Sequence, residues 1–277
     1  MIETQPQLTD AQFDQISAIV YSHCGINLHD GKRELVQARI AKRMRLRAIA
    51  SPIYYLRFAL DDSAEFTHLI DALSTNLTSF FREGEHFVHL ERAFLPGLLN
   101  RKRRTGIKTL RAWSAGCSTG EEPYTIAMTV LNAFDSADTW DFRILATDLS
   151  TAVLATARAG IYESARLQSI PPKLRARFTE TDPHQPRRYA RMRREIQDVI
   201  RFAQLNLMQT WPFRGPMDFI FCRNVMIYFD KPTQQKLVNR FWDLLAPGGL
   251  LFTGHSESLT GVVHRFEYVQ PTIYAKP

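Results

Sequence analysis

The sequence predicts an α/β protein, in which an all-helical N-terminal segment precedes a doubly wound sheet with a small antiparallel β insertion. From residue 109 onward, short runs of β-forming residues alternate with amphipathic helical stretches, which is typical of a parallel sheet with helices on both faces. The first 75 residues or so show helical periodicity and no strand-like alternation. With 277 residues, of which 45% are apolar and 23% charged, the chain has a globular composition.

Four helices are predicted in the N-terminal segment. The first follows an N-cap at Thr9 and Asp10, has apolar residues at helical spacing and ends at Cys24-Gly25-Ile26. The second covers residues 31–49, the third starts at Ser51-Pro52 with proline in its first turn, and the fourth covers residues 65–73.

The alternating part of the chain predicts the main sheet. The predicted elements are strand 109–115, helix 121–134, strand 141–148, helix 151–159, strand 217–222, helix 233–245 and strand 250–254. Residues 265–270 and 272–276 predict an antiparallel hairpin at the far side of the sheet.

Residues 171–201 interrupt the alternation with several prolines and many basic residues. Within this stretch Tyr189, Arg191 and Arg193 alternate with Ala190 and Met192, which favours an exposed strand rather than a core strand. We interpret the stretch as a small β insertion in the α/β domain.

Composition excludes several classes of protein. The three cysteines, Cys24, Cys117 and Cys222, are far apart, so a disulfide framework and a cysteine-based zinc site are disfavoured and no metal site is predicted. No apolar run approaches the length that spans a bilayer, and the N-terminus lacks the pattern of a signal peptide. We therefore expect a soluble, cytoplasmic protein without direct membrane insertion.

The net charge of +7 is concentrated in two basic patches. Residues 32–47 contain seven basic side chains against one acidic, and residues 162–201 contain ten against five. Such patches attract nucleic acid, anionic membrane or an acidic protein, and charge alone does not choose among these partners.

The strongest local signal is the segment WSAGCSTGEEPY at residues 113–124, which follows a predicted strand and opens a helix. Gly116 and Gly120 permit a sharp turn and close approach of a ligand to the backbone. Glu121 and Glu122 at the helix start would repel a pyrophosphate, and the Walker lysine and the complete dinucleotide glycine pattern are missing. The loop therefore favours a positively charged ligand over a nucleotide phosphate or NAD.

Asp148 ends the second predicted strand, where an acidic side chain commonly accepts hydrogen bonds from ribose hydroxyls. The alternative is an N-cap for the helix that begins near Ser150. A Pro-Gly-Gly turn at residues 247–249 precedes a buried strand. A nucleoside site, an acidic loop and this turn together indicate S-adenosylmethionine, whose sulfonium and amino groups are cationic.

Several long motifs resemble the chemotaxis receptor methyltransferase (CheR) family over nearly the whole chain. The motifs are TNLTSFFREGEHF at 75–87, WSAGCSTGEEPY at 113–124, Asp148, FCRNVMIYFD at 221–230, and PGGLLF at 247–252 followed by GHSE at 254–257. The resemblance implies a helical domain at 1–75, a linker and first helix at 76–105 that contribute to the cofactor site, and an S-adenosylmethionine-binding domain at 106–277, with a β-subdomain at about 180–203. It also implies an enzyme that methylates glutamate side chains of chemoreceptors and releases S-adenosylhomocysteine.

The same resemblance assigns roles to individual residues. The implied cofactor-binding residues are Asn76, Thr78, Arg82, Glu122, Asp148, Asn206, Leu207, Arg223 and Asn224. Arg82 and Tyr228 are implied to lie beside the transferred methyl group and to be catalytic. Without the family context, Arg82 would be interpreted as a surface charge, and Tyr228 could equally be a core residue.

The basic patches have candidate roles as docking surfaces. Lys32, Arg39 and Arg43 fall within about 40° of one another on a helix, and we interpret them as a dock for the acidic methylation helices of a receptor, consistent with the family. An ordinary solvated face is the alternative. Arg191 and Arg193 could bind another part of the receptor, since the β-subdomain of the family sometimes holds a receptor C-terminal peptide.

A glutamate nucleophile needs no general base, because its pKa near 4.3 leaves it ionised at neutral pH. His255 is accordingly interpreted as a structural histidine. The main rival is a nucleic-acid methyltransferase, but Cys222-Arg223-Asn224-Val225 lacks the proline pair common in enzymes that act on base amines, so nucleic acid is not an expected partner. A non-catalytic binding module is a second alternative, against which the intact Arg82, Glu122, Asp148 and Tyr228 argue.

Overall fold

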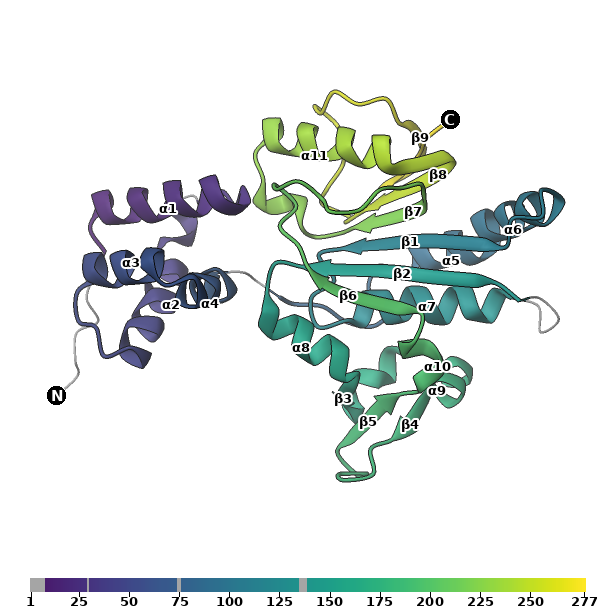
Figure 1. Ribbon diagram of the computed structural model, residues 1–277, viewed down its shortest axis with the longest axis horizontal. Helices are drawn as coiled ribbons and strands as arrows, with labels where there is room; N and C mark the ends of the chain where they lie inside the picture. Colours follow the sequence, from purple (N-terminus) through teal and green to yellow (C-terminus); the bar gives the residue numbers. More distant parts are fainter. Residues whose placement is uncertain (1–7, 29, 74–75, 135–138) are drawn as a thin grey trace.

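The computed structural model of the chain describes residues 8–28, 30–73, 76–134 and 139–277. A helical domain lies beside one end of a large sheet (Figure 1). Its described helices are α1 (Asp10–Cys24), α2 (Arg33–Leu46, preceded by the 3-10 turn Asp30–Lys32), α3 (Pro52–Asp61) and α4 (Ser63–Leu73). All four predicted helices are present, although α2 is shorter than the predicted 31–49.

Local sequence determines where α1 begins and ends. The Thr9 hydroxyl accepts a hydrogen bond from the backbone N–H of Gln12 at 3.3 Å, and the Gln12 side chain accepts one from the Thr9 N–H at 3.0 Å, which forms a capping box. Gly25 ends the helix with a φ of 74°, a conformation that glycine adopts without strain. The buried side chains of Phe13, Ile16 and Val20 then face α2, α3 and α4 in one apolar core.

A buried carboxylate ties the helical domain together. Glu65 of α4 is fully buried, and it accepts hydrogen bonds from Arg43 at 2.7 and 3.0 Å, from Arg47 at 2.6 Å and from the Tyr55 hydroxyl at 2.8 Å. Burial alone would raise the pKa of Glu65, but these donors outweigh it and lower that pKa to about 2. One side chain thereby joins α2, α3 and α4.

The large sheet has seven strands in the order β6-β2-β1-β7-β8-β10-β9. They are β1 (Thr109–Ala115), β2 (Asp141–Asp148), β6 (Ile200–Gln204), β7 (Met217–Cys222), β8 (Leu245–Thr253), β9 (Glu267–Gln270) and β10 (Ile273–Ala275). The first five pair in parallel, and β10 pairs antiparallel with both β8 and β9, which confirms the predicted doubly wound sheet and terminal hairpin. Strand β6 was not predicted.

Alternating side chains of the strands form two cores. In β7, Phe219 and Phe221 pack on the face covered by α5 (Glu85–His89), the π-helical turn Leu90–Phe94, α6 (Leu95–Arg104) and α7 (Glu121–Ala133). Ile220 and Cys222 belong to the opposite core, which is covered by α11 (Lys231–Leu244). This period of two is what a strand buried on both faces requires. Among the described helices, none is long and apolar enough to cross a membrane.

A second, three-stranded antiparallel sheet projects from the edge of the domain near α8 (Thr151–Ala159) (Figure 1). Its order is β3-β5-β4, from β3 (Ile161–Glu163), β4 (Thr179–Thr181) and β5 (Tyr189–Met192), with the short helices η3 (Ser164–Ser169), α9 (Pro172–Phe178) and α10 (Arg194–Gln197) around it. The prediction of an exposed strand was wrong: β5 is the central strand, and Met192 is fully buried. Arg193 lies just beyond this strand.

Replacing Glu65 with glutamine should reduce the free energy of unfolding by about 3 kcal/mol, because Arg43 and Arg47 lose the counter-charge of a fully buried carboxylate. The folded-state pKa of Glu65 lies below its ordinary value of 4.5, so its contribution is complete at neutral pH and is lost as pH falls from 4.5 toward about 2. Urea denaturation of the full chain, at neutral pH and at about pH 3, measures both effects. Glu34→Gln, at an exposed position of α2, is the control. An equal loss in the control would refute the role of Glu65.

Candidate active site

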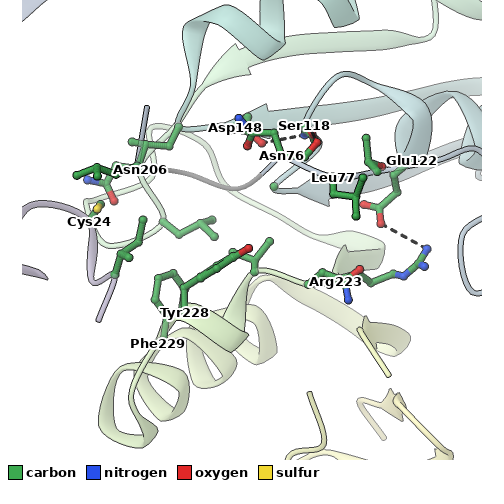
Figure 2. A pocket seen from close by; sticks show the side chains of 18 of the residues that line it. Cys24, Asn76, Leu77, Ser118, Glu122, Asp148, Asn206, Arg223, Tyr228 and Phe229 are labelled. Carbon is green, nitrogen blue, oxygen red and sulfur yellow. Dashed lines mark hydrogen bonds and ion pairs between the residues drawn. The ribbon is translucent and has the colours of Figure 1, made fainter. Parts of the chain in front are cut away.

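A pocket lies where the carboxyl ends of the parallel strands meet the helical domain (Figure 2). The end of α1, helix α2, the linker after α4 and the loops after β1, β2, β6 and β7 all contribute to its wall. The pocket lining includes Lys32, Arg39, Asn76, Thr78, Arg82, Gly116, Ser118, Glu122, Asp148, Asn206, Leu207, Arg223, Asn224, Val225 and Tyr228. Crevices at this edge of a doubly wound sheet are where such folds bind ligands.

The glycine turn after β1 shapes the pocket. Gly116 has a φ of +90°, and a Cβ built there would lie 2.3 Å from Cγ2 of Val225. The backbone N–H groups of Gly116 and Cys117 donate to the Thr147 carbonyl at 2.8 and 2.9 Å, which attaches the turn to β2. Gly120, with a φ of +98°, then starts α7. Both predicted glycines therefore hold backbone conformations that other residues rarely adopt.

The two adjacent glutamates of α7 face different surroundings. Glu122 lines the pocket, accepts a hydrogen bond from Ser114 Oγ at 2.7 Å and lies 3.5 Å from Nη1 of Arg223. Burial raises the pKa of Glu122. Glu121 is fully buried elsewhere, accepts a hydrogen bond from Thr119 and pairs with Arg166 of η3. Glu121 is therefore structural, whereas Glu122 faces the pocket.

Asp148 is the second carboxylate of the pocket. Its two oxygens accept hydrogen bonds from the backbone N–H groups of Ser118 at 2.8 Å and Ser150 at 3.0 Å (Figure 2). The cap of α8 is the Ser150 hydroxyl, which accepts from the Val153 N–H at 3.3 Å, so Asp148 is not that cap. Burial raises the pKa of Asp148, and each carboxylate oxygen retains acceptor capacity for a ligand hydroxyl.

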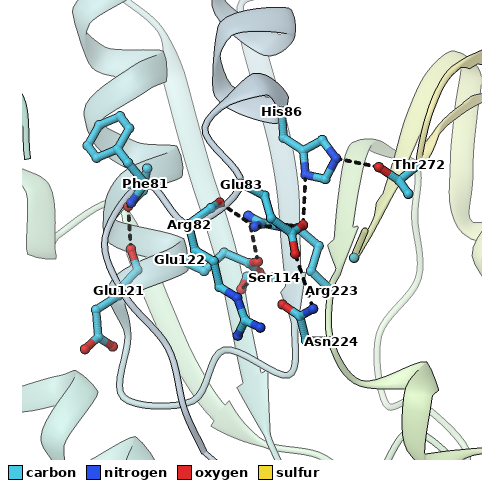
Figure 3. A network of polar contacts seen from close by, with 12 residues as sticks. Phe81, Arg82, Glu83, His86, Ser114, Glu121, Glu122, Arg223, Asn224 and Thr272 are labelled. Atoms are coloured by element: carbon cyan, nitrogen blue, oxygen red, sulfur yellow. Dashed lines mark hydrogen bonds and ion pairs between the residues drawn. The ribbon is translucent and has the colours of Figure 1, made fainter. Parts of the chain in front are cut away.

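Arg223 connects the pocket to the turn before α5, which contains Arg82 and Glu83 (Figure 3). Its side chain is 2% exposed, lies 3.2 Å from Oε2 of Glu83 and donates to the backbone carbonyl of Arg82. Asn224 donates to the other oxygen of Glu83 at 3.3 Å. Burial opposes ionisation of Glu83, but the charge of Arg223 together with hydrogen bonds from the His255 backbone and the Asn224 side chain outweighs it and lowers the pKa of Glu83. Next to this pair, burial and then Arg223 lower the pKa of His86 to about 4, so its imidazole is neutral at physiological pH.

The pocket thus suits an adenosyl cation. It offers carboxylates for positive charge and for ribose hydroxyls, together with apolar wall residues such as Leu149 and Leu207.

Comparison with known proteins gives the same answer. Residues 76–275 match the CheR methyltransferase, SAM binding domain family, and residues 11–74 match the CheR methyltransferase, all-alpha domain family. The chain belongs to the CheR methyltransferase family. It is an S-adenosylmethionine-dependent methyltransferase.

Individual relatives match the chain over most of its length. A probable chemotaxis protein methyltransferase of Rhizobium etli is 41% identical over 92% of this chain and 96% of its own. The chemotaxis protein methyltransferase of Escherichia coli is 41% identical over 97% of this chain and 91% of its own, and chemotaxis protein methyltransferase 2 of Pseudomonas aeruginosa is 40% identical over 96% and 93%. These matches span both the helical and the α/β parts.

The structure brings all the predicted cofactor-binding residues of this CheR-family chain to one pocket, and their individual roles stay predictions. Tyr228 is half-buried: it packs against the core under α11 and also lines the pocket, into which its side chain extends (Figure 2). Arg82 donates to the Leu77 carbonyl at 2.8 Å, which keeps the linker close to the pocket. Asn206 donates to the His23 carbonyl at 2.6 Å and accepts from the Met208 N–H at 2.9 Å, so it also joins the two domains.

The predicted docking residues are more dispersed. Lys32 and Arg39 line the pocket, and Nζ of Lys32 lies 4.7 Å from the ring centre of Tyr228. Arg43 instead contributes to the cluster around Glu65 described above. In the small sheet, Arg191 lies 3.5 Å from Asp182, and Arg193 donates to the Thr179 carbonyl at 3.1 Å. These contacts give Arg43, Arg191 and Arg193 internal partners, and their docking roles stay predictions.

Two further carboxylates were not singled out from the sequence. Glu83 is the partner of Arg223, and its position directly after Arg82 gave no sign of a buried ion pair. Glu257 accepts hydrogen bonds from the backbone N–H groups of Asn224 at 2.7 Å, Gly254 at 2.6 Å and Ile227 at 3.0 Å. The GHSE motif that contains Glu257 was the available signal. Its function is to hold the loop after β7 against the end of β8.

Replacing Gly116 with alanine should destabilise the protein by about 1–3 kcal/mol, because the new methyl group strains the backbone and clashes with Val225. Gly106→Ala separates the two effects: Gly106 has a φ of +70° with nothing within 4 Å of its built Cβ. It should therefore show the strain alone, about 1 kcal/mol. Thermal denaturation of the variants measures the difference. Adding Val225→Ala should recover the clash part, and a double variant no more stable than Gly116→Ala would contradict the packing explanation.

Proposed function

We propose that the protein transfers the methyl group of S-adenosylmethionine to glutamate side chains of chemoreceptors in chemotaxis, giving glutamate methyl esters and S-adenosylhomocysteine. The single observation that carries this proposal is a pocket lined by two carboxylates, Glu122 and Asp148, in a chain of the CheR methyltransferase family. The names of the relatives, chemotaxis protein methyltransferases, support the receptor as substrate. The protein would methylate this substrate in the cytoplasm.

Each part of the cofactor has a matching group in the pocket. Glu122 would balance the methionine ammonium group, and Asp148 would accept hydrogen bonds from the ribose. Asn206 and Leu207 would contact the adenine, one through its polar edge and the other through its face. The remaining predicted contacts are Asn76, Thr78, Arg82, Arg223 and Asn224. Residues 1–75 would form the substrate-docking domain, 76–105 would complete the cofactor site, and 106–277 would bind the cofactor.

The protein's own contribution to catalysis would be alignment and exclusion of water. The bound cofactor supplies a methyl group on a sulfonium, which is an activated leaving group. Arg82 would attract the substrate carboxylate, and Tyr228 would limit its approach to one direction. Holding two reactants in line can lower the barrier by several kcal/mol, and an ionised carboxylate needs no proton removed.

Docking would use the basic residues at the mouth of the pocket. Lys32 and Arg39 both face it, and burial, followed by repulsion from Arg39, lowers the pKa of Lys32. Two cations held this close favour an acidic partner such as a receptor methylation helix. Arg191 and Arg193 of the small sheet would engage a receptor C-terminal peptide. Arg43 would support this surface through Glu65 rather than contact the receptor.

The proposed function is tested by transfer of radiolabelled methyl groups from S-adenosylmethionine to receptor-containing membranes, compared with RNA and DNA. We expect label in the receptor that is released by mild alkali, because methyl esters hydrolyse there and N-methyl groups do not. Label that enters nucleic acid, or that survives alkali on protein, would refute the glutamate ester.

Glu122→Gln should weaken S-adenosylmethionine binding roughly 10- to 100-fold, because the ammonium group loses its counter-charge while the Arg223 guanidinium stays nearby. Wild-type affinity should also fall as pH is lowered through the raised pKa of Glu122, and the variant should lack this dependence. Calorimetric titration measures both. 5′-Methylthioadenosine, which lacks the amino-acid group, is the matched ligand and should bind both proteins equally. Equal loss for both ligands would place Glu122 elsewhere in the site.

Tyr228→Phe should reduce turnover at least about tenfold while S-adenosylmethionine affinity stays near that of the wild type. The reason is that the hydroxyl would act on the reacting groups and not on the rest of the cofactor. Steady-state methylation and calorimetry together separate the two quantities. Tyr54→Phe removes a hydroxyl from an exposed tyrosine of α3 and is the control. Unchanged turnover in Tyr228→Phe would make Tyr228 a wall residue only.

A further inference from the structure

Three potential metal ligands, Glu83, His86 and His255, lie close together next to Arg223. None of the three lines the pocket. Glu83 and His86 stand three residues apart at the start of α5, and His255 follows the end of β8. One ligand atom from each lies within 4.8 Å of the other two. The proposed methyl transfer uses neither histidine.

The hydrogen bonds of His86 determine which ring nitrogen carries the proton. His86 is 1% exposed, and its Nε2 lies 2.7 Å from Oγ1 of Thr272 (Figure 3). That hydroxyl donates to the Pro271 carbonyl at 2.6 Å, and the His86 tautomer consistent with this bond carries its hydrogen on Nε2 and donates it to Thr272. Nδ1 of the neutral ring is therefore an acceptor with a free lone pair.

This lone pair faces another acceptor. Nδ1 of His86 has no hydrogen-bond partner among the described residues, and it lies 3.7 Å from Oε2 of Glu83. Two buried acceptors that face each other without a shared hydrogen are unfavourable. Nε2 of His255 lies 4.0 Å from the same Glu83 oxygen. A cation between the three atoms would satisfy all of them.

We propose that Glu83 Oε2, His86 Nδ1 and His255 Nε2 bind a divalent transition metal, with Zn²⁺ as the reference ion. Two imidazoles and one carboxylate are an established zinc ligand set, and the fourth position would hold water. Ligand atoms around tetrahedral zinc lie about 3.3 Å apart, so the site needs contraction of at most about 1.5 Å. His255 has a side chain that is 58% exposed and can make this movement. The bond from Nε2 of His86 to Thr272 is the outer contact that such ligands commonly have.

Metal binding would affect the pocket through Glu83. Its Oε2 is also the atom 3.2 Å from Nη2 of Arg223, so the metal and Arg223 compete for it. Arg223 also lies 3.5 Å from Glu122, and a weaker bond to Glu83 would strengthen its pairing with that carboxylate. This coupling rests on the proposed role of Glu122 in binding the cofactor. If Glu122 pairs more strongly with Arg223, the metal would weaken cofactor binding, and the cofactor would weaken metal binding by the same factor.

The test is titration of the metal-free full-length protein with zinc chloride by calorimetry, without cofactor. We expect one site with a dissociation constant of about 10 μM or tighter. His255→Asn should weaken it about tenfold or more, whereas His184→Asn, at an exposed histidine of the small sheet, should not. Cobalt(II) should give the intense visible absorption of tetrahedral coordination. His255→Cys should retain binding and add a near-ultraviolet thiolate-to-cobalt band.

Absence of saturable zinc binding, or equal affinity in wild type and His255→Asn, would overturn the proposal. Retained binding in His255→Cys without a thiolate band would also overturn it, because the metal would then lie elsewhere. None of these readouts involves methyl transfer. A failure of the proposed function therefore leaves the metal result intact, and the reverse also holds.

Discussion

The charge balance around Arg223 is the constraint on which the rest of the site depends. One buried guanidinium lies within 3.5 Å of two carboxylates, those of Glu83 and Glu122. Paired with Glu83 and stacked over the rings of Phe87 and Phe221, it cannot fully neutralise both. The part of the pocket around Glu122 therefore retains some negative charge in a poorly solvated place, whereas Lys32, Arg39 and Arg82 line other parts of the wall. A cationic cofactor completes this balance, whereas a phosphate-bearing ligand would worsen it.

The helical domain contributes to the same site because it closes over the strand ends. The Asn27 N–H donates to the Tyr228 carbonyl at 2.8 Å, and the Tyr21 hydroxyl donates to Asp230 at 2.8 Å. Asn206 reaches the carbonyl of His23 from the other side of the pocket. These contacts join the end of α1 to the loops after β6 and β7. The pocket-lining side chains of Lys32 and Arg39, which belong to the helical domain, are thus held next to the strand ends of the α/β domain.

Much of the fold could be predicted because its elements are long enough to show a period. Strand β1 occupies the predicted residues 109–115, and α8 the predicted 151–159. Strand β3 has three residues, too few to show alternation, and β6 lay at the edge of a stretch interpreted as an insertion. The helical wheel placed Arg43 beside Arg39 correctly in angle, but angle does not reveal a partner such as Glu65 from a later helix.

The candidate site shows the same limit at the level of single side chains. Residues in continuous motifs, such as Glu122 and Asp148, could be located because they follow strands that end at one edge of the sheet. Glu121 and Glu122 look equivalent in sequence, yet consecutive helical residues point about 100° apart, so only one faces the pocket. Arg223 and its partner Glu83 are 140 residues apart in the chain. His86 and its partner Thr272 are 186 residues apart. No local sequence pattern can predict contacts over such separations.

The histidines of this region also explain what kind of catalysis the site can support. His86 is buried with one nitrogen committed to Thr272, and the ring nitrogen of His255 that is nearest to a carboxylate faces Glu83 rather than the cavity. Neither residue lines the pocket. None of the described residues that line the pocket is a histidine, so a substrate that had to lose a proton, such as an amine or an alcohol, would find no imidazole base among them. A carboxylate, which is ionised before it arrives, requires only charge and alignment, and in the proposed mechanism Arg82, Tyr228 and the two pocket acids would provide these.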